Sequence, residues 1–132
     1  IGLEDLKLLL NLEQLDLLVN QAEIKPAFVQ NRCYAQMKWD AHVREFCRAN
    51  DIVYQGFSLL TANARELNQP EIHQIAQRLK CSWTQMVFRF ALQVGMQPIT
   101  GTTSPVHMKE DLAVYELELT PLEVETIENI AL

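Results

Sequence analysis

The sequence predicts an α/β fold of parallel βα units, with three to four strands and with the helices on the outer side of the sheet. Three short apolar segments have strand character, and segments of helical periodicity separate them. Right-handed crossovers place such helices on one side of a sheet that curls. A sheet of this size leaves its other face open. We therefore expect either a part of something larger or a chain that pairs with another.

The expected strands span residues 28–34, 52–60 (with the exit loop) and 98–100. Lys25-Pro26 precedes the first strand and ends a helix, because a residue before proline avoids the α region. No linker, internal repeat or charge block interrupts the chain, so we expect residues 1–132 to form a single, partial domain. Residues 1–10 stand apart as an atypical leucine-rich N-terminal segment.

The helix starts carry hydroxyl or amide caps, and Ser82–Gln85 and Thr120–Glu123 have the spacing of a capping box. Gly95 is placed to be a left-handed residue after a helix end. The other expected starts are at Asn11, Asp40, Asn68 and Ser104-Pro105. The apolar positions expected to face the core are Leu12, Leu15, Leu17, Leu18 and Ala22; Val43, Phe46 and Cys47; Ile72, Ile75, Ala76 and Leu79; Met86, Phe88, Phe90, Ala91 and Leu92; and Leu122, Ile127 and Ile130.

The composition excludes several classes of protein. Seventeen acidic against 11 basic residues give a net charge of −6, which argues against binding to nucleic acid or to an anionic membrane surface. No apolar stretch approaches the ~20 residues that span a bilayer. The cysteines Cys33, Cys47 and Cys81 are odd in number and widely spaced, which favours a reducing, cytoplasmic location. The three histidines share no ligand spacing, so no metal site is expected.

Three motifs occur in a fixed order along the chain. Residues 26–34 read PAFVQNRCY, residues 52–60 read IVYQGFSLL, and residues 98–112 read PITGTTSPVHMKEDL. In order and separation they resemble the sixth, seventh and eighth strands, with their following loops, of the aldo-keto reductase family. The resemblance runs from about residue 11 to residue 132. It implies the C-terminal half of a TIM-type (β/α)8 barrel, in a family that reduces carbonyls with NADPH or, less often, NADH.

The resemblance implies a site for the nicotinamide end of the cofactor at the carboxyl ends of the strands, where barrel enzymes place their chemistry. Gln30 would bond the carboxamide, Phe57 would stack on the nicotinamide ring, and Ser58 and Leu60 would lie against the pyrophosphate. From residue type alone, Gln30 is a half-exposed polar residue, Phe57 a core residue and Ser58 a turn former.

The adenosine end of the cofactor would lie at the last motif, residues 98–112, just before and along its helix. The N-terminus of that helix favours an anion. Thr102 and Thr103 would meet the ribose or its 2′-phosphate, and Glu110 and Asp111 match positions beside the adenine. Two cofactor positions remain, Gly101 and His107. At these positions the family carries basic residues that bind the 2′-phosphate. The resemblance therefore implies NADP or NAD without a clear preference.

Catalytic residues are not expected in this chain. The family takes its Asp, Tyr, Lys and His tetrad from the first four strands, and no matching segment is present. The Ser-Asn pair that follows the family's fifth strand is replaced by Glu4-Asp5, whose carboxylates would repel a phosphate.

Two functions from different classes follow. In the first, the chain is the nucleotide-binding half of an NAD(P)H-dependent carbonyl oxidoreductase, not catalytic on its own, and its partner is the missing N-terminal half-barrel. In the second, it is a non-catalytic half-barrel, natural or engineered, that self-associates as a homodimer. The leucine-rich segment 1–10 favours the second slightly, because it could cover exposed apolar surface.

Overall fold

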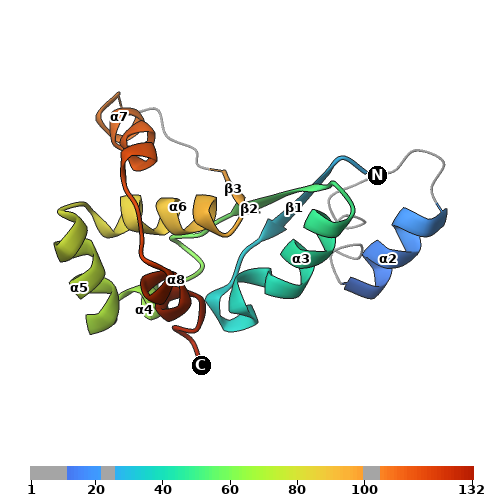
Figure 1. The fold of residues 1–132 in the computed structure, drawn as a ribbon, viewed down its shortest axis with the longest axis horizontal. Coiled ribbons are helices and arrows are strands. Elements are labelled where there is room, and N and C mark those ends of the chain that lie inside the picture. Colours follow the sequence, from blue (N-terminus) through green and yellow to red (C-terminus); the bar gives the residue numbers. More distant parts are fainter. Residues whose placement is uncertain (1–11, 22–25, 100–104) are drawn as a thin grey trace.

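The computed structural model describes residues 12–21, 26–99 and 105–132. Its centre is a three-stranded parallel sheet in the order β1 (Phe28–Arg32), β2 (Val53–Phe57) and β3 (Gln97–Pro98). The sheet lies in the middle of an elongated molecule, with α2 at one end and α5 at the other (Figure 1). The expected α/β arrangement of parallel strands is confirmed.

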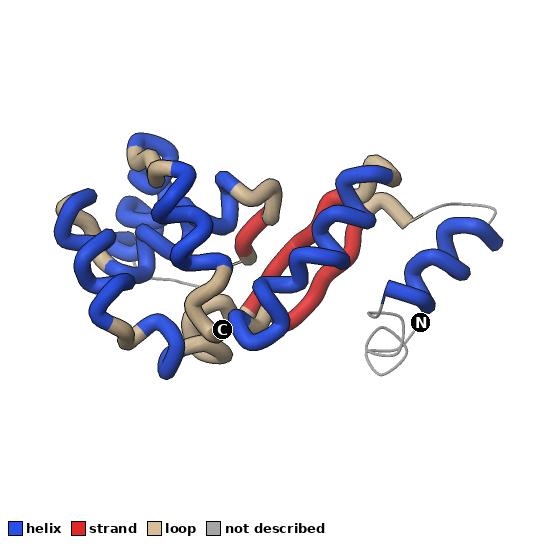
Figure 2. Tube along the Cα trace, turned by 60° about the horizontal axis from the view of Figure 1, so that its bottom comes forward, coloured by secondary structure: helices blue, strands red, loops and turns tan. Residues whose placement is uncertain are grey.

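Seven α-helices and two short 3₁₀ helices surround the sheet in the described parts of the chain. Helix α3 packs against β2 and helix α6 against β3, so the covering helices gather on one face, as Figure 2 shows for α3. None of the described helices is both long and apolar enough to cross a membrane. The helices are α2 (Leu12–Gln21), α3 (Ala41–Ala49), α4 (Ala64–Leu67), α5 (Pro70–Leu79), α6 (Trp83–Gln93), α7 (Pro105–Ala113) and α8 (Pro121–Glu128), and the 3₁₀ helices are η1 (Ala35–Asp40) and η2 (Val114–Glu116).

The two faces of the sheet differ in burial because side chains alternate along a strand. Val29 and Asn31 on β1 and Tyr54 on β2 point toward the helices and are buried. Gly56 lies on the same face, and a Cβ there would clash with the Sδ atom of the buried Met96, so any larger residue would force that side chain to shift. The opposite face carries the exposed or half-buried side chains of the strands, such as Phe28 and Gln30 on β1 and Phe57 on β2, and we call it the open face.

The core is organised around Trp39, which lies in η1 and is fully buried. Its ring meets the edge of Phe90 on α6, with 5.3 Å between the ring centroids. Its Nε1 donates a 2.9 Å hydrogen bond to the carbonyl of Ile127 on α8. One side chain therefore joins three elements that are far apart in the sequence.

The local signals at the helix ends are mostly confirmed. Ser82 and Thr120 accept from the backbone of Gln85 and Glu123, and both capping boxes are complete. Gly95 follows α6 with φ +80°, in the left-handed region that glycine tolerates.

Two expected caps differ from the prediction. Asp40 precedes α3 but makes no capping bond, because its carboxylate accepts from Tyr54 and Asn31 instead. Helix α5 begins at Pro70, and the residue before it is Gln69 rather than Asn68.

Two expected core positions are wrong. Leu17 is 52% exposed and Leu122 is 72% exposed. Helical geometry gives the reason, because residues two or five positions apart point to different sides of a helix. Leu15 and Val19 face the core on α2, and Ile127 does so on α8.

Several element bounds also differ from the prediction. The first strand ends at Arg32 and the third spans only Gln97–Pro98, although the Ile99 amide still donates to the Gly56 carbonyl. Helices η1, α4 and η2 were not predicted, because elements of three to six residues carry no usable periodicity. Segment 1–10, Asn11, Ala22, Thr100 and Ser104 lie outside the described residues, as do the side chains of Leu12 and Leu18.

Candidate functional site

The turn after β2 presents three of the predicted cofactor residues. Phe57 ends the strand and is 37% exposed on the open face. Ser58 follows with φ +55°, a left-handed conformation that costs a residue with a side chain about 1 kcal/mol or more. Leu60 is half-buried and packs beside the core. The strained turn thus holds Ser58 directly beside an exposed aromatic ring.

A buried asparagine fixes this turn to the neighbouring strand end. Asn63 is 1% exposed, and its Oδ1 accepts from the Ala35 amide at 2.7 Å. Its Nδ2 donates to the carbonyls of Cys33 and Leu59, each at 2.8 Å. These bonds join the segment after β1 to the segment after β2. The carboxyl ends of both strands are therefore held together by one side chain, which no sequence pattern had singled out.

A row of three glutamines crosses the open face. Gln30 pairs in register with Gln55, and Gln55 with Gln97. Gln30 Nε2 donates to Gln55 Oε1 at 2.9 Å, and Gln55 Nε2 donates to Gln97 Oε1 at 2.6 Å. Only Gln30 was predicted from the sequence. Gln55 lies within the second expected strand and Gln97 directly before the third, but the register that aligns the three glutamines is a tertiary property.

A second polar group lies on the helix side of the sheet. Asp40 Oδ2 accepts from Tyr54 Oη at 2.6 Å and from Asn31 Nδ2 at 2.7 Å. Burial is the main cause that raises the pKa of Tyr54, and the negative charge of the neighbouring Asp40 carboxylate adds to it. Burial and the charge of Asp40 raise the pKa of Cys33 to about 12. Both groups therefore stay protonated at neutral pH and offer no nucleophile, so we regard this group as structural.

The predicted adenosine residues are only partly described. Glu110 and Asp111 lie half-buried on α7, and the Glu110 carbonyl accepts from Gln85 Nε2 at 3.1 Å. Asp111 lines a cavity of about 520 Å³ together with Val53 and Gln97, the first residues of their strands. The structure therefore does not place Asp111 beside Phe57, at the other end of β2.

The other predicted adenosine residues cannot be located in the same way. Gly101, Thr102 and Thr103 lie outside the described residues, as does the side chain of His107. Their roles stay predictions.

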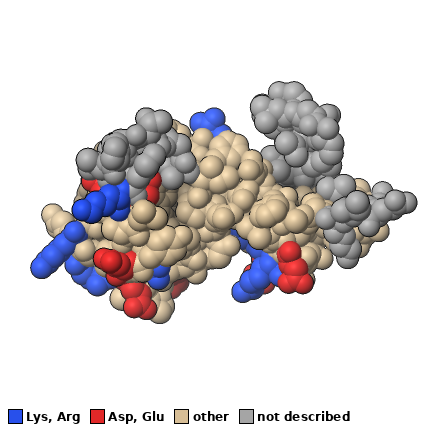
Figure 3. All heavy atoms as spheres, turned by 90° about the horizontal axis from the view of Figure 1, so that it is seen from above, with Lys and Arg blue, Asp and Glu red and all other residues tan. Residues whose placement is uncertain are grey.

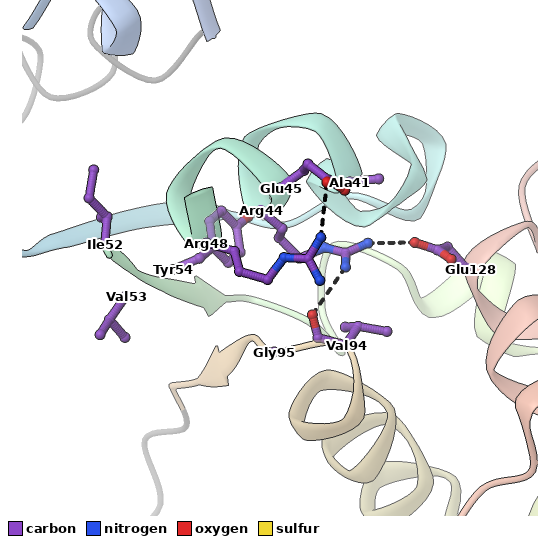
Figure 4. Close-up of a pocket in the computed structure, with 10 residues that line it drawn as sticks. All are labelled: Ala41, Arg44, Glu45, Arg48, Ile52, Val53, Tyr54, Val94, Gly95 and Glu128. Carbon is purple, nitrogen blue, oxygen red and sulfur yellow. Dashed lines mark hydrogen bonds and ion pairs between the residues drawn. The ribbon is translucent and has the colours of Figure 1, made fainter. Parts of the chain in front are cut away.

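A second cavity, of about 330 Å³, lies at the start of β2 (Figure 4). Arg44 dominates it, and its guanidinium is almost fully buried. That group donates to the carbonyls of Trp39 and Val94 and pairs with Glu128 at 2.7 Å. The N–H donors of the Arg44 guanidinium are thus used within the protein, so this cavity is a structural ion-pair site. None of the predicted cofactor residues lines it.

In the described strands, the charged residue of the open face is Arg32, which pairs in register with Phe57. Seen from above, charged side chains gather at the left end and below the middle, a basic side chain stands at the upper edge, and largely uncharged surface lies between them (Figure 3). The apolar members of the open face include Phe28, Val53, Phe57 and Ile99, each of which is more than a third exposed.

Comparisons with known proteins agree with this geometry. The chain is 25% identical over 132 residues to rho crystallin of Aquarana catesbeiana, covering 91% of this chain and 40% of that protein. It is 29% identical over 118 residues to NADPH-dependent codeinone reductase 1-5 of Papaver somniferum, covering 85% and 34%. The crystal structure of an aldo/keto reductase from Brucella melitensis superposes with a TM-score of 0.77 at 21% identity, covering 91% of this chain and 45% of that one.

The chain thus spans less than half the length of the proteins that it matches. The family model described as "Aldo/keto reductase family" matches residues 10–132, which is nearly the whole sequence. On that match, the chain belongs to the aldo/keto reductase family.

Proposed function

We propose that this chain is the nucleotide-binding, C-terminal half of an NAD(P)H-dependent carbonyl oxidoreductase and is not catalytic on its own. The observation that carries the proposal is the placement of Gln30 and Phe57. Gln30 pairs with Gln55, and Phe57 lies two residues further along β2 on the same open face. In the register Phe57 pairs with Arg32, so Gln30 is its diagonal neighbour on the adjacent strand. An aromatic ring and a primary amide on one face of a sheet fit a ring that bears a carboxamide, such as nicotinamide. One relative is named as NADPH-dependent, which supports the same cofactor class.

In this proposal each residue has the role that its position supports. Phe57 stacks on the nicotinamide, Gln30 bonds its carboxamide, and Ser58 and Leu60 lie along the pyrophosphate. The bound cofactor supplies the hydride, and this chain binds and orients it. Tyr54, the tyrosine of β2, does not supply a proton donor on the open face, because it is buried against Asp40 on the helix side.

We expect weak dinucleotide binding with less than tenfold preference for NADPH over NADH. Gly101 stands where the family carries a basic residue that binds the 2′-phosphate, so this chain lacks that contact. A tenfold ratio of the two affinities corresponds to only ~1.4 kcal/mol, which is about one charge-assisted hydrogen bond. Isothermal titration calorimetry with both cofactors measures the ratio. Tenfold tighter binding of NADPH would contradict the expectation.

The same titration tests the proposed stacking residue. Phe57→Ala should weaken both cofactors by roughly fivefold, since aromatic contacts contribute about 1 kcal/mol. Phe28→Ala is the matched control. It removes the same ring from the same face but at the amino end of β1, where Phe28 is 59% exposed, and it should leave both affinities unchanged. Equal losses in the two variants would argue against the site at Phe57.

The second proposal concerns the partner that covers the open face. We infer that this face meets either a second copy of the chain or a separate N-terminal half-barrel. The exposed apolar side chains on the sheet support this inference, because soluble monomers rarely expose large apolar patches and the edges of a sheet invite pairing. The default for identical chains is a C₂ dimer.

If the chain self-associates, light scattering at micromolar concentration should show a dimer or a larger closed assembly. Val53→Glu places a charge on the open face and should split the assembly, since an unpaired charge is costly to bury. Leu122→Glu is the control, because Leu122 is exposed on α8 and away from the sheet, and its variant should associate as before. A folded monomer that does not associate would rule out the homodimer and leave the N-terminal half-barrel as the partner.

We also propose a cytoplasmic location. Cys33, Cys47 and Cys81 are all unpaired, and burial raises the pKa of Cys47 to about 11. Unpaired thiols are usual in a reducing compartment. Fractionation of cells that express the protein, followed by detection of the chain, tests this location.

A further inference from the structure

A positive charge lies on the open face directly beside the proposed stacking residue. Arg32 ends β1 and pairs in register with Phe57, which ends β2, and both side chains are on the exposed side of the sheet. Neighbouring strands are only about 4.8 Å apart, and side chains directly opposite each other on one face are close enough to interact. A ring that stacks on Phe57 therefore lies close to the Arg32 side chain.

The contacts of Arg32 hold its charge at this end of the strand. The Cζ atom of its guanidinium lies 5.7 Å from the centre of the Tyr34 ring, which is a cation–π distance. The backbone is still extended at Tyr34 (φ −111°, ψ 129°), so residues 32 and 34 point to the same side. No carboxylate in the described parts of the chain forms an ion pair with Arg32. The carboxylate of Asp40 lies on the helix side, where Tyr54 and Asn31 donate to it.

The two redox forms of a nicotinamide dinucleotide differ in the charge of the ring. The reduced ring is neutral. It becomes a pyridinium cation when a hydride, the hydrogen at C4 with both electrons of its bond, passes to a carbonyl carbon and the carbonyl oxygen takes up a proton. The phosphates, riboses and carboxamide are the same in both forms. A positive charge beside the ring therefore repels the oxidised form and leaves the neutral form without this repulsion.

We propose that Arg32 sets the redox-state preference of the site, so that this chain binds the reduced dinucleotide more tightly than the oxidised one. The inference rests on the proposed dinucleotide function and adds a residue that this function did not use. Unit charges roughly 10 Å apart, at an effective dielectric constant of about 50, change an affinity about threefold. A reduction consumes the reduced form and produces the oxidised form, so the repulsion favours entry of the hydride donor and release of the product cofactor.

Calorimetric titration with NADH and with NAD⁺ measures the preference as the ratio of the Kd for NAD⁺ to the Kd for NADH. Arg32→Gln removes the charge and should lower this ratio about threefold, mainly because NAD⁺ binds more tightly. Arg32→Lys keeps the charge and should leave the ratio within about twofold of that of the unmodified protein. Raising the salt from about 0.05 to 0.5 M should shrink the difference between the unmodified protein and Arg32→Gln, because salt screens exposed charges.

Arg48→Gln is the matched control, because it makes the same change in net charge at the other end of the sheet. The Arg48 side chain is 79% exposed and lines the cavity at the start of β2, together with Val53. Val53 and Phe57 are four residues apart on the strand, which corresponds to roughly 13 Å. This exceeds the screening length of about 8 Å at physiological ionic strength, so the ratio should not change in this variant.

The outcomes separate this inference from the proposed function. Binding of both forms with an unchanged ratio in Arg32→Gln would overturn the inference and leave the proposed function standing. Equal weakening of NADH and NAD⁺ in Arg32→Gln would also overturn it, since Arg32 would then contact the phosphates. An equal change of the ratio in Arg48→Gln would reduce the effect to net charge and overturn it as well. Failure of the unmodified protein to bind either form would refute the proposed function, and this inference with it.

Discussion

Trp39→Ala is expected to lower the free energy of unfolding by about 3–5 kcal/mol, close to the limit of what a small domain tolerates. Trp39 is fully buried, and the substitution removes the edge contact with Phe90 and leaves the Ile127 carbonyl without its donor. The backbone adds a second reason. Lys38, Trp39 and Asp40 all have φ near +55°, and such strain persists only where side-chain contacts hold it.

Urea unfolding followed by circular dichroism measures this loss. Trp83→Ala is the matched control, because Trp83 is 39% exposed at the start of α6 and its truncation should cost much less, about 1 kcal/mol. Trp39→Phe should fall between the two, since it keeps most of the buried ring but loses the donor to Ile127. Equal effects of the two alanine variants would show that Trp39 does not organise the core.

Asn63→Ala is expected to destabilise the chain by about 3 kcal/mol or more. It leaves the Ala35 amide and the carbonyls of Cys33 and Leu59 without their partner, and an unsatisfied buried polar group costs about 1–3 kcal/mol. Because these bonds join the ends of β1 and β2, the variant should also loosen the turn at Ser58 and weaken dinucleotide binding. Equilibrium urea unfolding gives the first quantity and calorimetry the second.

Two controls make this prediction specific. Asn20→Ala removes an exposed asparagine on α2 that donates a hydrogen bond to Asp16 in the same helix, so it should change stability by no more than about 0.5 kcal/mol. Asn63→Asp keeps an acceptor for the Ala35 amide but loses both donated bonds, so it should be no more stable than Asn63→Ala. If Asn63→Asp were as stable as the unmodified protein, the bonds to Cys33 and Leu59 would not matter.

The sequence alone determined the features whose physics is local. Capping boxes at Ser82 and Thr120 join residues three positions apart, and Gly95 follows a helix end where a left-handed φ is needed. Alternating strands and helices likewise fixed the parallel α/β arrangement. The ordered motifs led to the family, and the match over residues 10–132 confirmed it.

Tertiary structure decided which side of each element is covered and which polar groups meet. Leu17 and Leu122 are apolar but point away from the core, and the Asp40 carboxylate accepts from Tyr54 on β2 rather than capping its own helix. Gln30 was visible as a single residue, but its alignment with Gln55 and Gln97 depends on a register between strands separated by long crossovers. Periodicity describes each segment by itself, whereas register and packing arise only when the segments are brought together.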